Sequence, residues 1–443
     1  MKHVMRKSFF IFLATVIMAF SIAIQPLSAQ ASEVDLEAES AILVDANTGK
    51  ILFAKNADKL FPPASMTKMM TEYLVWEAVE KGQISWDTTT QISDYPYSIS
   101  ADSTFSGIGL KQAKDYKVKD LYHAMAINSD NAATIALAEL IAGSEGEFVK
   151  LMNKKGEEMG LPDFEFVNST GIENESLGDN HPKGTDPNGV NYLSAKSAAL
   201  LAYHLIHDFP KALEISSKPT VKFDGKELRN LNWMLQHDKT NFEEFYYEGV
   251  DGLKTGFTDL AGYTFTGTAK KGDRRLISVV MKTKSEAKRF EQTAKLLDYG
   301  FQKFENTEIF PAGYQLEDKS SIPVNKGKKD DVSISLAESV SLPIKPDEKD
   351  LYKITYTLDQ EKLNKDGELT APIKKGEKIG TAQIMYKADN DYGYITKDSN
   401  STVDVVTDTS VEKSNWFMLT IGAIGDFFVD LFNTVVDWIK GLF

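Results

Sequence analysis

The stretch Ser65-Met66-Thr67-Lys68 stands at the head of an amphipathic segment that runs from Ser65 to Lys81 and stops before Gly82. The segment holds apolar residues and no internal Pro or Gly, which predicts a helix of about four turns. Residues three apart share a helix face, so we expect Lys68 to project beside the Ser65 hydroxyl. A serine becomes a good nucleophile when a neighbouring base takes its proton. Burial or a second cation would lower the pKa of Lys68 and make it such a base.

Ser-x-x-Lys alone is a weak signal, because the chain contains it twice more, as Ser285-Glu-Ala-Lys288 and Ser410-Val-Glu-Lys413. A serine that caps a helix, followed by a surface lysine, explains each of these two occurrences. Ser65 differs because two further motifs follow it in order.

The second motif is Ser129-Asp130-Asn131, which falls between predicted helices at Lys119–Ile127 and Asn131–Ala142. A short loop there can place a hydroxyl and a carboxamide side by side in a cleft. The hydroxyl can relay a proton, and the carboxamide can hold a substrate amide. The alternative is that Ser129 or Asp130 simply caps the second helix.

The third motif is Lys254-Thr255-Gly256, which precedes a predicted hairpin, Tyr263–Ala269 and Arg275–Met281. We place it on a sheet strand that faces the cleft, where Lys254 and Thr255 would supply a cation and a hydroxyl for a substrate carboxylate. Gly256 would allow a close approach of backbone and ligand. The alternative is a solvated strand-end lysine followed by a turn glycine.

In this order the three motifs resemble those of penicillin-binding proteins and class A β-lactamases. The chain is similar to low-molecular-mass penicillin-binding proteins that are D-alanyl-D-alanine carboxypeptidases, in particular the Gram-positive major vegetative type. The similarity covers nearly the whole chain. It includes the segments Pro63–Thr71, Phe166–Gly171 and Asp251–Gly256.

The resemblance implies a serine peptidase that removes the terminal D-alanine from peptidoglycan stem peptides. Ser65 would attack the carbonyl of the penultimate D-alanine, Lys68 would accept its proton, and Ser129 would relay a proton to the leaving amine. Backbone N–H groups of Ser65 and Phe257 would form the oxyanion hole. β-Lactams should acylate Ser65, and no metal or cofactor is expected. The substrate-binding residues implied are Asn131, Lys254, Thr255, Gly256, Phe257 and Arg275, of which Arg275 rests on its strand position alone.

Two alternatives stay open. A class A-like β-lactamase needs a deacylating glutamate held by an asparagine four residues later, whereas Glu165 and Asn168 are three apart here. A non-catalytic scaffold that binds the cell wall is the alternative of another class, and three intact motifs argue against it.

Composition and the N-terminal sequence limit the class of protein to which the chain can belong. With 443 residues, 42% hydrophobic and 26% charged, the chain is globular with room for two or three domains. Its net charge of −14 argues against a nucleic-acid partner, and the lack of cysteine excludes disulfides and thiolate metal sites. Lys2, Arg6 and Lys7, an apolar run from Phe9 to Ile24 and Ala29-Gln30-Ala31 predict a secretory signal peptide over 1–31. The alternative is a permanent membrane anchor.

Strand patterns at both ends of a helical stretch predict one α/β catalytic domain with an antiparallel sheet over 32–305. Short strands at Ser40–Ala46 and Lys50–Lys55 form its first hairpin. We expect further helices at 144–159, 194–207 and 285–304, and loops at 87–115 and 168–191. Residues 306–408 hold three candidate strands, Val332–Leu336, Tyr352–Leu358 and Lys378–Tyr386. The resemblance implies a small all-β sandwich that acts as a spacer, and the alternative is that it only stabilises the catalytic domain.

The segment 415–443 predicts an amphipathic helix at its end. Polar residues step by three and four along one face, at Asp426, Asp430, Asn433, Asp437 and Lys440, and large apolar residues cover the rest. Its longest charge-free run is about half of the roughly 20 residues that span a bilayer. We therefore expect an interfacial helix that anchors a secreted enzyme on the extracytoplasmic face of the cell membrane. The alternative is an ordinary amphipathic helix docked on a domain.

Overall fold

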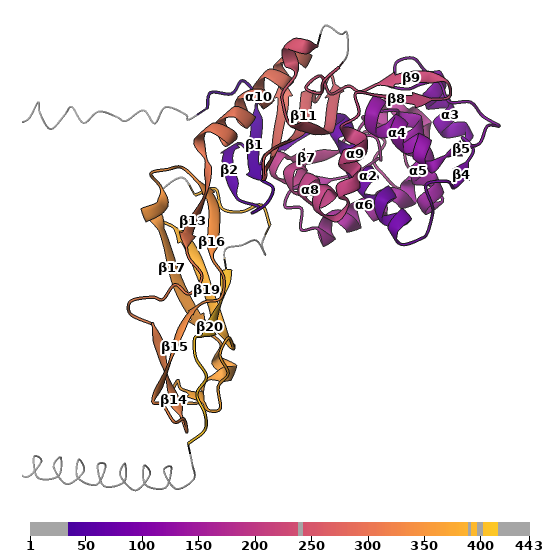
Figure 1. The fold of residues 1–443 in the computed structure, drawn as a ribbon. Coiled ribbons are helices and arrows are strands. Elements are labelled where there is room, and N and C mark those ends of the chain that lie inside the picture. Colours follow the sequence, from indigo (N-terminus) through magenta and orange to yellow (C-terminus); the bar gives the residue numbers. More distant parts are fainter. Residues whose placement is uncertain (1–33, 238–241, 389–390, 397–401, 415–443) are drawn as a thin grey trace, which may run out of the picture. The chain divides into compact units, whose positions relative to one another are not determined.

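A computed structural model of the chain describes residues 34–237, 242–388, 391–396 and 402–414 (Figure 1). The predicted signal peptide and the predicted helix of residues 415–443 lie outside these residues. Within the described ranges, no helix has the length and apolar character that a membrane crossing requires.

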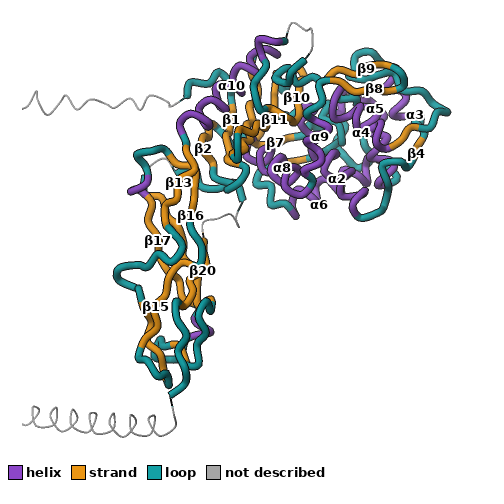
Figure 2. The backbone as a smooth tube through the Cα atoms, in the orientation of Figure 1, coloured by secondary structure: helices purple, strands orange, loops and turns teal. Residues whose placement is uncertain are grey.

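The elements follow one another in a strand, helix, strand order up to residue 303 and are all strands or short turns after it (Figure 2). The α-helices are α2 (Lys68–Glu80), α3 (Asp94–Ala101), α4 (Val118–Asn128), α5 (Asn131–Ala142), α6 (Glu145–Glu158), α7 (Asn174–Leu177), α8 (Ala195–Asp208), α9 (Leu213–Ser216) and α10 (Glu286–Lys303). The strands up to α10 are β1 (Ser40–Asp45), β2 (Ile51–Lys55), β3 (Leu60–Phe61), β4 (Thr89–Thr90), β5 (Tyr116–Lys117), β6 (Phe164–Glu165), β7 (Tyr192–Ser194), β8 (Thr220–Phe223), β9 (Lys226–Arg229), β10 (Val250–Thr258), β11 (Gly262–Lys271) and β12 (Arg274–Thr283). The later strands are β13 (Glu305–Phe310), β14 (Ser321–Asn325), β15 (Asp331–Leu336), β16 (Val340–Ile344), β17 (Tyr352–Leu358), β18 (Leu369–Thr370), β19 (Lys378–Tyr386) and β20 (Thr402–Thr407). The 3-10 turns are η1 (Ala64–Thr67), η2 (Gly178–Asn180), η3 (Pro210–Ala212), η4 (Glu243–Phe245), η5 (Lys349–Leu351) and η6 (Gln360–Lys362).

The central sheet joins strands from both sides of the helical stretch. Its order is β10-β11-β12-β1-β2, and all neighbours are antiparallel. Ile42 of β1 pairs with Val279 of β12, and Val44 pairs with Ile277. All four side chains belong to the large core shared with the helices. The predicted α/β arrangement with an antiparallel sheet is therefore confirmed.

The two faces of this sheet are covered by different helices (Figure 1). Side chains alternate along a strand, so Leu43 and Leu276 point away from the helical core and toward α10. Gly300 of α10 contacts them so closely that an added Cβ would lie 2.6 Å from Leu276 Cδ1. On the opposite face, α8 packs on β1 and β12, and α2 packs on β10. Residues of α2 are thereby brought against the edge strand that carries the third motif.

The helix predicted over Ser65–Lys81 is divided in two. The nucleophile candidate lies in the 3-10 turn η1, and the α-helix begins only at Lys68. Ala64, just before Ser65, has a positive φ of 47°, so the chain enters the turn from a left-handed conformation.

The segment expected as a loop over 87–115 contains the helix α3. Ser93 stands at its N-cap, Asp94 lies in its first turn, and Ile99 is buried. Ile99 packs with Ile135 and Leu177 in a separate small core, so tertiary burial stabilises a helix that polar composition hides.

The region after α10 has its own core. A six-stranded sheet in the order β17-β19-β20-β15-β14-β18 and the pair β13-β16 share buried side chains that include Val332, Leu342 and Ile379. The three predicted strands of this region are confirmed as β15, β17 and β19, and the β-rich class holds. Five further strands were not predicted, because they are short or lack a clear alternation of apolar and polar residues.

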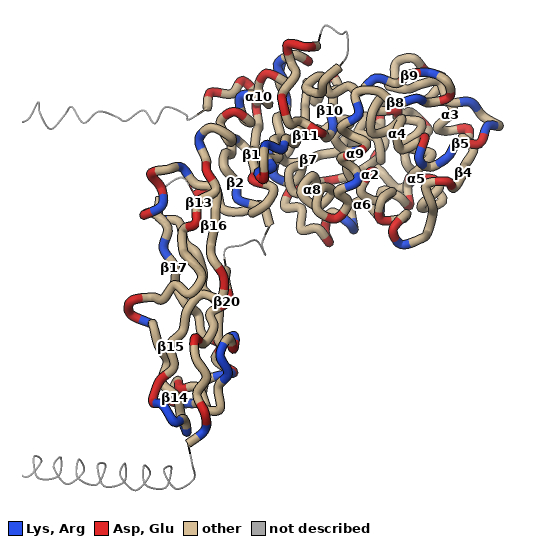
Figure 3. Tube along the Cα trace, in the orientation of Figure 1, with Lys and Arg blue, Asp and Glu red and all other residues tan. Residues whose placement is uncertain are grey.

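Charged residues are spread along both regions. Figure 3 shows Lys and Arg interspersed with Asp and Glu over the helices of the first region and the strands of the second. Acidic and basic residues are therefore intermixed along the described chain (Figure 3).

Phe290 of α10 supplies a stability test. Its side chain is 1% exposed, and its ring centroid lies 5.3 Å from those of Trp233 and Phe265. We expect Phe290→Ala to destabilise the catalytic region by about 3–5 kcal/mol, because it removes these contacts and leaves a cavity. Urea unfolding followed by tryptophan fluorescence measures the change. Leu151→Ala, at a residue that is 39% exposed, is the control, and equal shifts in the two variants would contradict the assignment of Phe290 to the core.

Candidate active site

Ser65 and Lys68 meet at the start of α2. Lys68 Nζ lies 2.8 Å from Ser65 Oγ, and the Lys68 side chain is fully buried. Nζ also donates to Asn131 Oδ1 and to the carbonyl oxygen of Thr170, both at 2.8 Å. A neutral amine has two N–H groups and one lone pair. Since those two oxygens can only accept, the lone pair is left facing the Ser65 hydroxyl, which is the geometry of a general base.

The electrostatics of the site favour the neutral amine. Burial lowers the pKa of Lys68 well below its usual value, and the positive charge of Lys254 lowers it further. The acidic groups Asp130, Glu145 and Glu72 oppose this shift. Burial likewise lowers the pKa of Lys254, to about 8, so the site holds two lysines with depressed pKa values.

The three residues of the second motif, Ser129-Asp130-Asn131, make different contacts. Ser129 ends α4 in the left-handed conformation, with φ 63°. Its buried Oγ has no hydrogen-bond partner among the described residues. Asp130 is the residue that caps α5, where its Oδ1 accepts from Ala133 N at 2.6 Å. Asn131 accepts from Lys68 and donates through Nδ2 to Ser106 O at 3.1 Å. The capping alternative therefore applies to Asp130, while Ser129 keeps an unused hydroxyl.

The third motif lies on β10, the edge strand of the central sheet. Lys254 and Thr255 are both buried, and Lys254 Nζ donates to Thr255 O at 3.3 Å. A Cβ added at Gly256 would lie 2.5 Å from Pro63 O and 3.2 Å from Met66 N. In this structure the glycine thus allows close contact between β10 and the turn that carries Ser65.

Phe257 follows the motif and presents an aromatic ring at the surface. It is 47% exposed and stacks on Tyr263 of the neighbouring strand, with ring centroids 4.3 Å apart. The next residue, Thr258, donates to Glu173 Oε1 at 2.7 Å and so joins the end of β10 to the 168–191 segment.

Arg275 lies in a different environment from the one expected. Its guanidinium donates to both carboxylate oxygens of Asp251 at 2.7 Å and to Thr268 Oγ1 at 2.9 Å. A bidentate carboxylate already neutralises it, so we do not carry Arg275 into the proposed substrate site.

Arg289 of α10, which no sequence motif indicates, contacts the third motif directly. Its Nη1 donates to Gly256 O at 3.2 Å, its side chain is buried, and its charge lowers the pKa of Lys254. Contact between α10 and the strand backbone decides this position, and no sequence spacing reports that contact.

The segment Asn168–Gly171 holds the back of the site. Asn168 Oδ1 accepts from Thr170 N and Gly171 N, and Ser169 donates from both N and Oγ to Glu145 Oε1. These bonds aim the carbonyl of Thr170 at Lys68. The sequence of this segment resembles that of the family, but the role of a backbone carbonyl cannot be read from side-chain identities.

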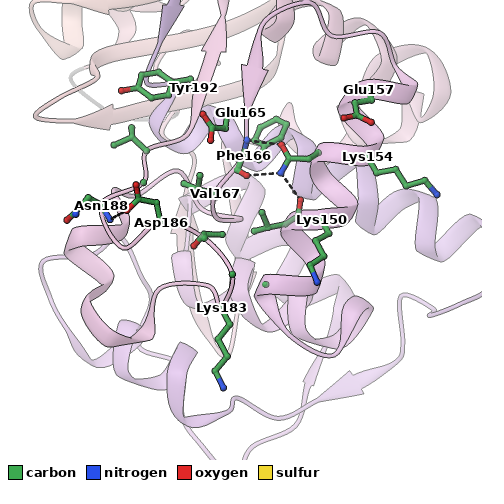
Figure 4. A pocket seen from close by; sticks show the side chains of 17 residues that line it. Lys150, Lys154, Glu157, Glu165, Phe166, Val167, Lys183, Asp186, Asn188 and Tyr192 are labelled. Carbon is green, nitrogen blue, oxygen red and sulfur yellow. Dashed lines mark hydrogen bonds between the residues drawn. The ribbon is translucent and has the colours of Figure 1, made fainter.

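A separate hollow of about 720 Å³ lies near Glu165, Phe166 and Val167, just before this segment in the sequence (Figure 4). Residues of α6 and of the 183–192 stretch line it, and Asn153 bonds across it to the backbone N and O of Phe166. Glu165, the glutamate considered for a β-lactamase, is exposed and lines this hollow. The predicted site residues lie elsewhere.

A serine beside a buried neutral lysine, a free second hydroxyl and a lysine on an edge strand define a site for serine acyl transfer. The D-alanyl-D-alanine carboxypeptidase family, peptidase S11, matches residues 27–285. The C-terminal domain of penicillin-binding protein 5 matches residues 304–413. The chain therefore belongs to the low-molecular-mass penicillin-binding proteins, and it is a serine-type D-alanyl-D-alanine carboxypeptidase.

Individual relatives match between 60% and 85% of the chain. The D-alanyl-D-alanine carboxypeptidase DacF of Bacillus subtilis (strain 168) is 33% identical over 360 residues, which is 81% of this chain and 84% of the relative. The crystal structure of a peptidoglycan synthesis regulatory factor, PBP3 of Streptococcus pneumoniae, matches with 36% identity and a TM-score of 0.68, over 85% of this chain and 99% of that chain. Penicillin-binding protein D2 of Listeria monocytogenes in its ampicillin-bound form matches with 34% identity and a TM-score of 0.51, over 60% of this chain and 98% of that chain.

Gly171 provides a test of whether close backbone contacts position Ser65. It has φ 87°, and an added Cβ would lie 1.9 Å from the carbonyl oxygen of Ala64, next to the nucleophile candidate. We expect Gly171→Ala to slow acylation by a fluorescent penicillin about a hundredfold, because the turn that carries Ser65 must move. Gly184→Ala is a matched control, since Gly184 has φ 89° with open space around it. Similar acylation rates in the two variants would show that the contact does not position Ser65.

Proposed function

We propose that Ser65 is the nucleophile of the carboxypeptidase reaction and that Lys68 is its general base. Ser65 Oγ attacks the carbonyl carbon of the penultimate D-alanine, and its proton passes to Lys68 Nζ. The peptide C–N bond then breaks, and Ser129 Oγ relays a proton to the departing amine of the terminal D-alanine. Water hydrolyses the acyl-enzyme by the reverse use of the same groups. The observation that carries this proposal is the 2.8 Å approach of the buried Lys68 Nζ to Ser65 Oγ.

The edge strand supplies the substrate-binding part of the proposal. Lys254 and Thr255 hold the terminal carboxylate through a cation and a hydroxyl, and Gly256 leaves the strand backbone accessible. Backbone N–H groups of Ser65 and Phe257 stabilise the oxyanion. Asn131 both orients Lys68 and faces the substrate amide. The substrate is a peptidoglycan stem peptide that ends in D-Ala-D-Ala.

β-Lactams enter the same proposal as covalent inhibitors. The Listeria relative has been crystallised in ampicillin-bound and cefotaxime-bound forms. This chain carries the three motifs around one serine, so we expect the opened lactam to esterify Ser65 Oγ. Glu165 is exposed and lines a hollow that contains none of the proposed site residues, so it gives no support to rapid deacylation of such an adduct.

Covalent labelling tests the assignment of the nucleophile. Fluorescent penicillin should label the purified protein, and Ser65→Ala should abolish both labelling and D-alanine release from a D-Ala-D-Ala peptide. Ser285→Ala is the matched control, because Ser285 also precedes a lysine by three residues but only caps α10, accepting from Lys288 N at 3.2 Å. Labelling that persists in Ser65→Ala would assign the nucleophile to another serine.

We also propose the division of the chain and its location. The parts are a signal peptide over 1–31, a catalytic domain over 32–305, a β-sandwich spacer over 306–408 and an amphipathic anchor over 415–443. The family substrate, a cell-wall peptide, and the sequence pattern of the two terminal segments support a secreted enzyme. It is held peripherally at the extracytoplasmic face of the membrane.

Liposome flotation tests the anchor. In the helix predicted from the sequence of 415–443, about ten large apolar residues would lie opposite the polar face, and burying each stabilises by roughly 1.5–3 kcal/mol when burial is complete. The few acidic residues oppose binding to anionic lipid by roughly 1 kcal/mol each at most. The full chain should therefore float with anionic liposomes at low and high salt. Deletion of 415–443 should give an active enzyme that does not float. A truncated protein that floats, or a full chain that salt removes, would exclude a hydrophobic anchor in this segment.

A further inference from the structure

Glu72 is a buried acid directly behind the proposed catalytic lysine. It lies four residues after Lys68 on α2, so the two side chains share a helix face. Its side chain is 3% exposed, and α2 packs at this level against α4, α5 and β10. The motif Ser-x-x-Lys does not include it, and the mechanism above makes no use of it.

A directed chain of hydrogen bonds holds the Glu72 carboxyl group. Trp76 Nε1 donates to Tyr122 Oη at 2.8 Å, and Tyr122 Oη lies 3.0 Å from Glu72 Oε2. An indole N–H can only donate, so the tyrosine oxygen accepts from it and donates its own proton to Glu72. Tyr122 is fully buried on α4. The chain therefore presents Glu72 with a donor, and a carboxylate accepts from a donor more strongly than a carboxylic acid does.

Two buried lysines lie within the field of this carboxylate. Glu72 raises the pKa values of both Lys68 and Lys254, whereas Arg289, which is paired with Glu286, lowers that of Lys254. Asp130 and Glu145 act on Lys68 from α5 and α6. Burial raises the pKa of Glu72 to about 7, and the charge of Lys254 and the Tyr122 hydrogen bond counteract this effect.

Charge balance makes these groups interdependent. An ammonium group in a buried site tends to lose its proton unless an opposite charge is near. Lys254 Nζ makes one hydrogen bond to the residues that the structure describes, to Thr255 O, and that carbonyl carries no full charge. The buried anion that acts on it is Glu72. Once Lys254 is a cation, its repulsion adds to the effect of burial, which lowers the pKa of Lys68 most.

We propose that Glu72 is a positioning residue that assigns the charges of the two lysines, keeping the cation on Lys254 and so leaving Lys68 as the free base. This inference rests on the roles proposed above for Ser65, Lys68 and Lys254. Glu72 touches neither substrate nor nucleophile. It acts through the lysines, and the hydrogen bond from Tyr122 favours its charged form.

The test is the pH dependence of acylation by a fluorescent penicillin in Glu72→Gln. Loss of the carboxylate removes an opposite charge from both lysines, so both titrate at lower pH. The alkaline limb of the rate profile, where Lys254 loses its proton, should move down by about one pH unit. The variant should then lose about tenfold more rate near pH 9 than near pH 6. A loss that is uniform across the pH range, or an unshifted limb, would overturn the proposal and leave Glu72 a structural role.

Matched variants keep the test decisive. Glu77→Gln, on the same helix but in an outer ion pair with Lys155, should leave the profile unchanged. Tyr122→Phe removes the hydroxyl donor and keeps the ring, so it should shift the alkaline limb in the same direction by less. Glu72→Asp keeps a carboxylate, so its alkaline limb should lie closer to the wild-type position than that of Glu72→Gln. An alkaline limb that is unshifted in Tyr122→Phe but shifted in Glu77→Gln would contradict the proposed role of the Trp76–Tyr122–Glu72 hydrogen-bond chain.

The test of Glu72 can fail independently of the test of Ser65 as the nucleophile. If Ser65→Ala retains labelling, the proposed mechanism fails whatever Glu72 does. If Ser65→Ala is inactive and Glu72→Gln has the wild-type profile, only the role of Glu72 fails. Thermal unfolding of each variant, measured beside the rates, identifies a Glu72→Gln protein that does not fold, and Tyr122→Phe then decides the question.

Discussion

The burial of one lysine amine is the constraint on which the rest of this structure depends. Lys68 Nζ is enclosed by the Ser65 hydroxyl, the Asn131 carboxamide and the Thr170 carbonyl, each 2.8 Å away. An amine in such a place is kept neutral by desolvation and by a neighbouring cation, and a neutral amine is what serine activation requires. Three elements far apart in sequence must therefore converge on one nitrogen atom, and the packing of α2, α5 and the 168–171 segment serves that convergence.

Close backbone contacts provide the convergence. The turn that carries Ser65 is held between Gly171 on one side and Gly256 on the other, and neither position leaves room for a Cβ. On the far side of β10, α10 contributes Arg289, whose bond to Gly256 O supports the strand. The central sheet positions β10 at its edge, so that one side of the strand meets the nucleophile turn and its free edge is left for a substrate. The fold thus places the proposed nucleophile, its proposed base and the strand proposed to bind the carboxylate with little freedom between them.

The buried charged groups of the site are arranged as specifically as its close backbone contacts. The site contains two buried lysines, and a fully buried acid lies one helical turn beyond the first of them. The charge of Glu72 acts on Lys254, and Arg289, which is paired with Glu286, opposes it. Asp130 and Glu145 take part differently, because each spends its carboxylate on backbone N–H groups that shape the loops around Lys68. The proposed role of Glu72 thus concerns the charges of the lysines, whereas Asp130 and Glu145 stabilise the local backbone structure.

The sequence alone determined the helices with strong periodicity, the first hairpin, the sheet strands around the third motif and the family, since each depends on local pattern or on contiguous motifs. It placed Ser65 and Lys68 together, because three residues along a helix fix that relation. It did not determine that Ser65 lies in a 3-10 turn, that α3 forms in a polar stretch, or that Arg275 pairs with Asp251. The carbonyl of Thr170, the support from Arg289 and the buried Glu72 were equally invisible. Those features depend on long-range packing, where a backbone atom or a charge acts on a residue that no spacing in the sequence connects to it, and only the tertiary structure decided them.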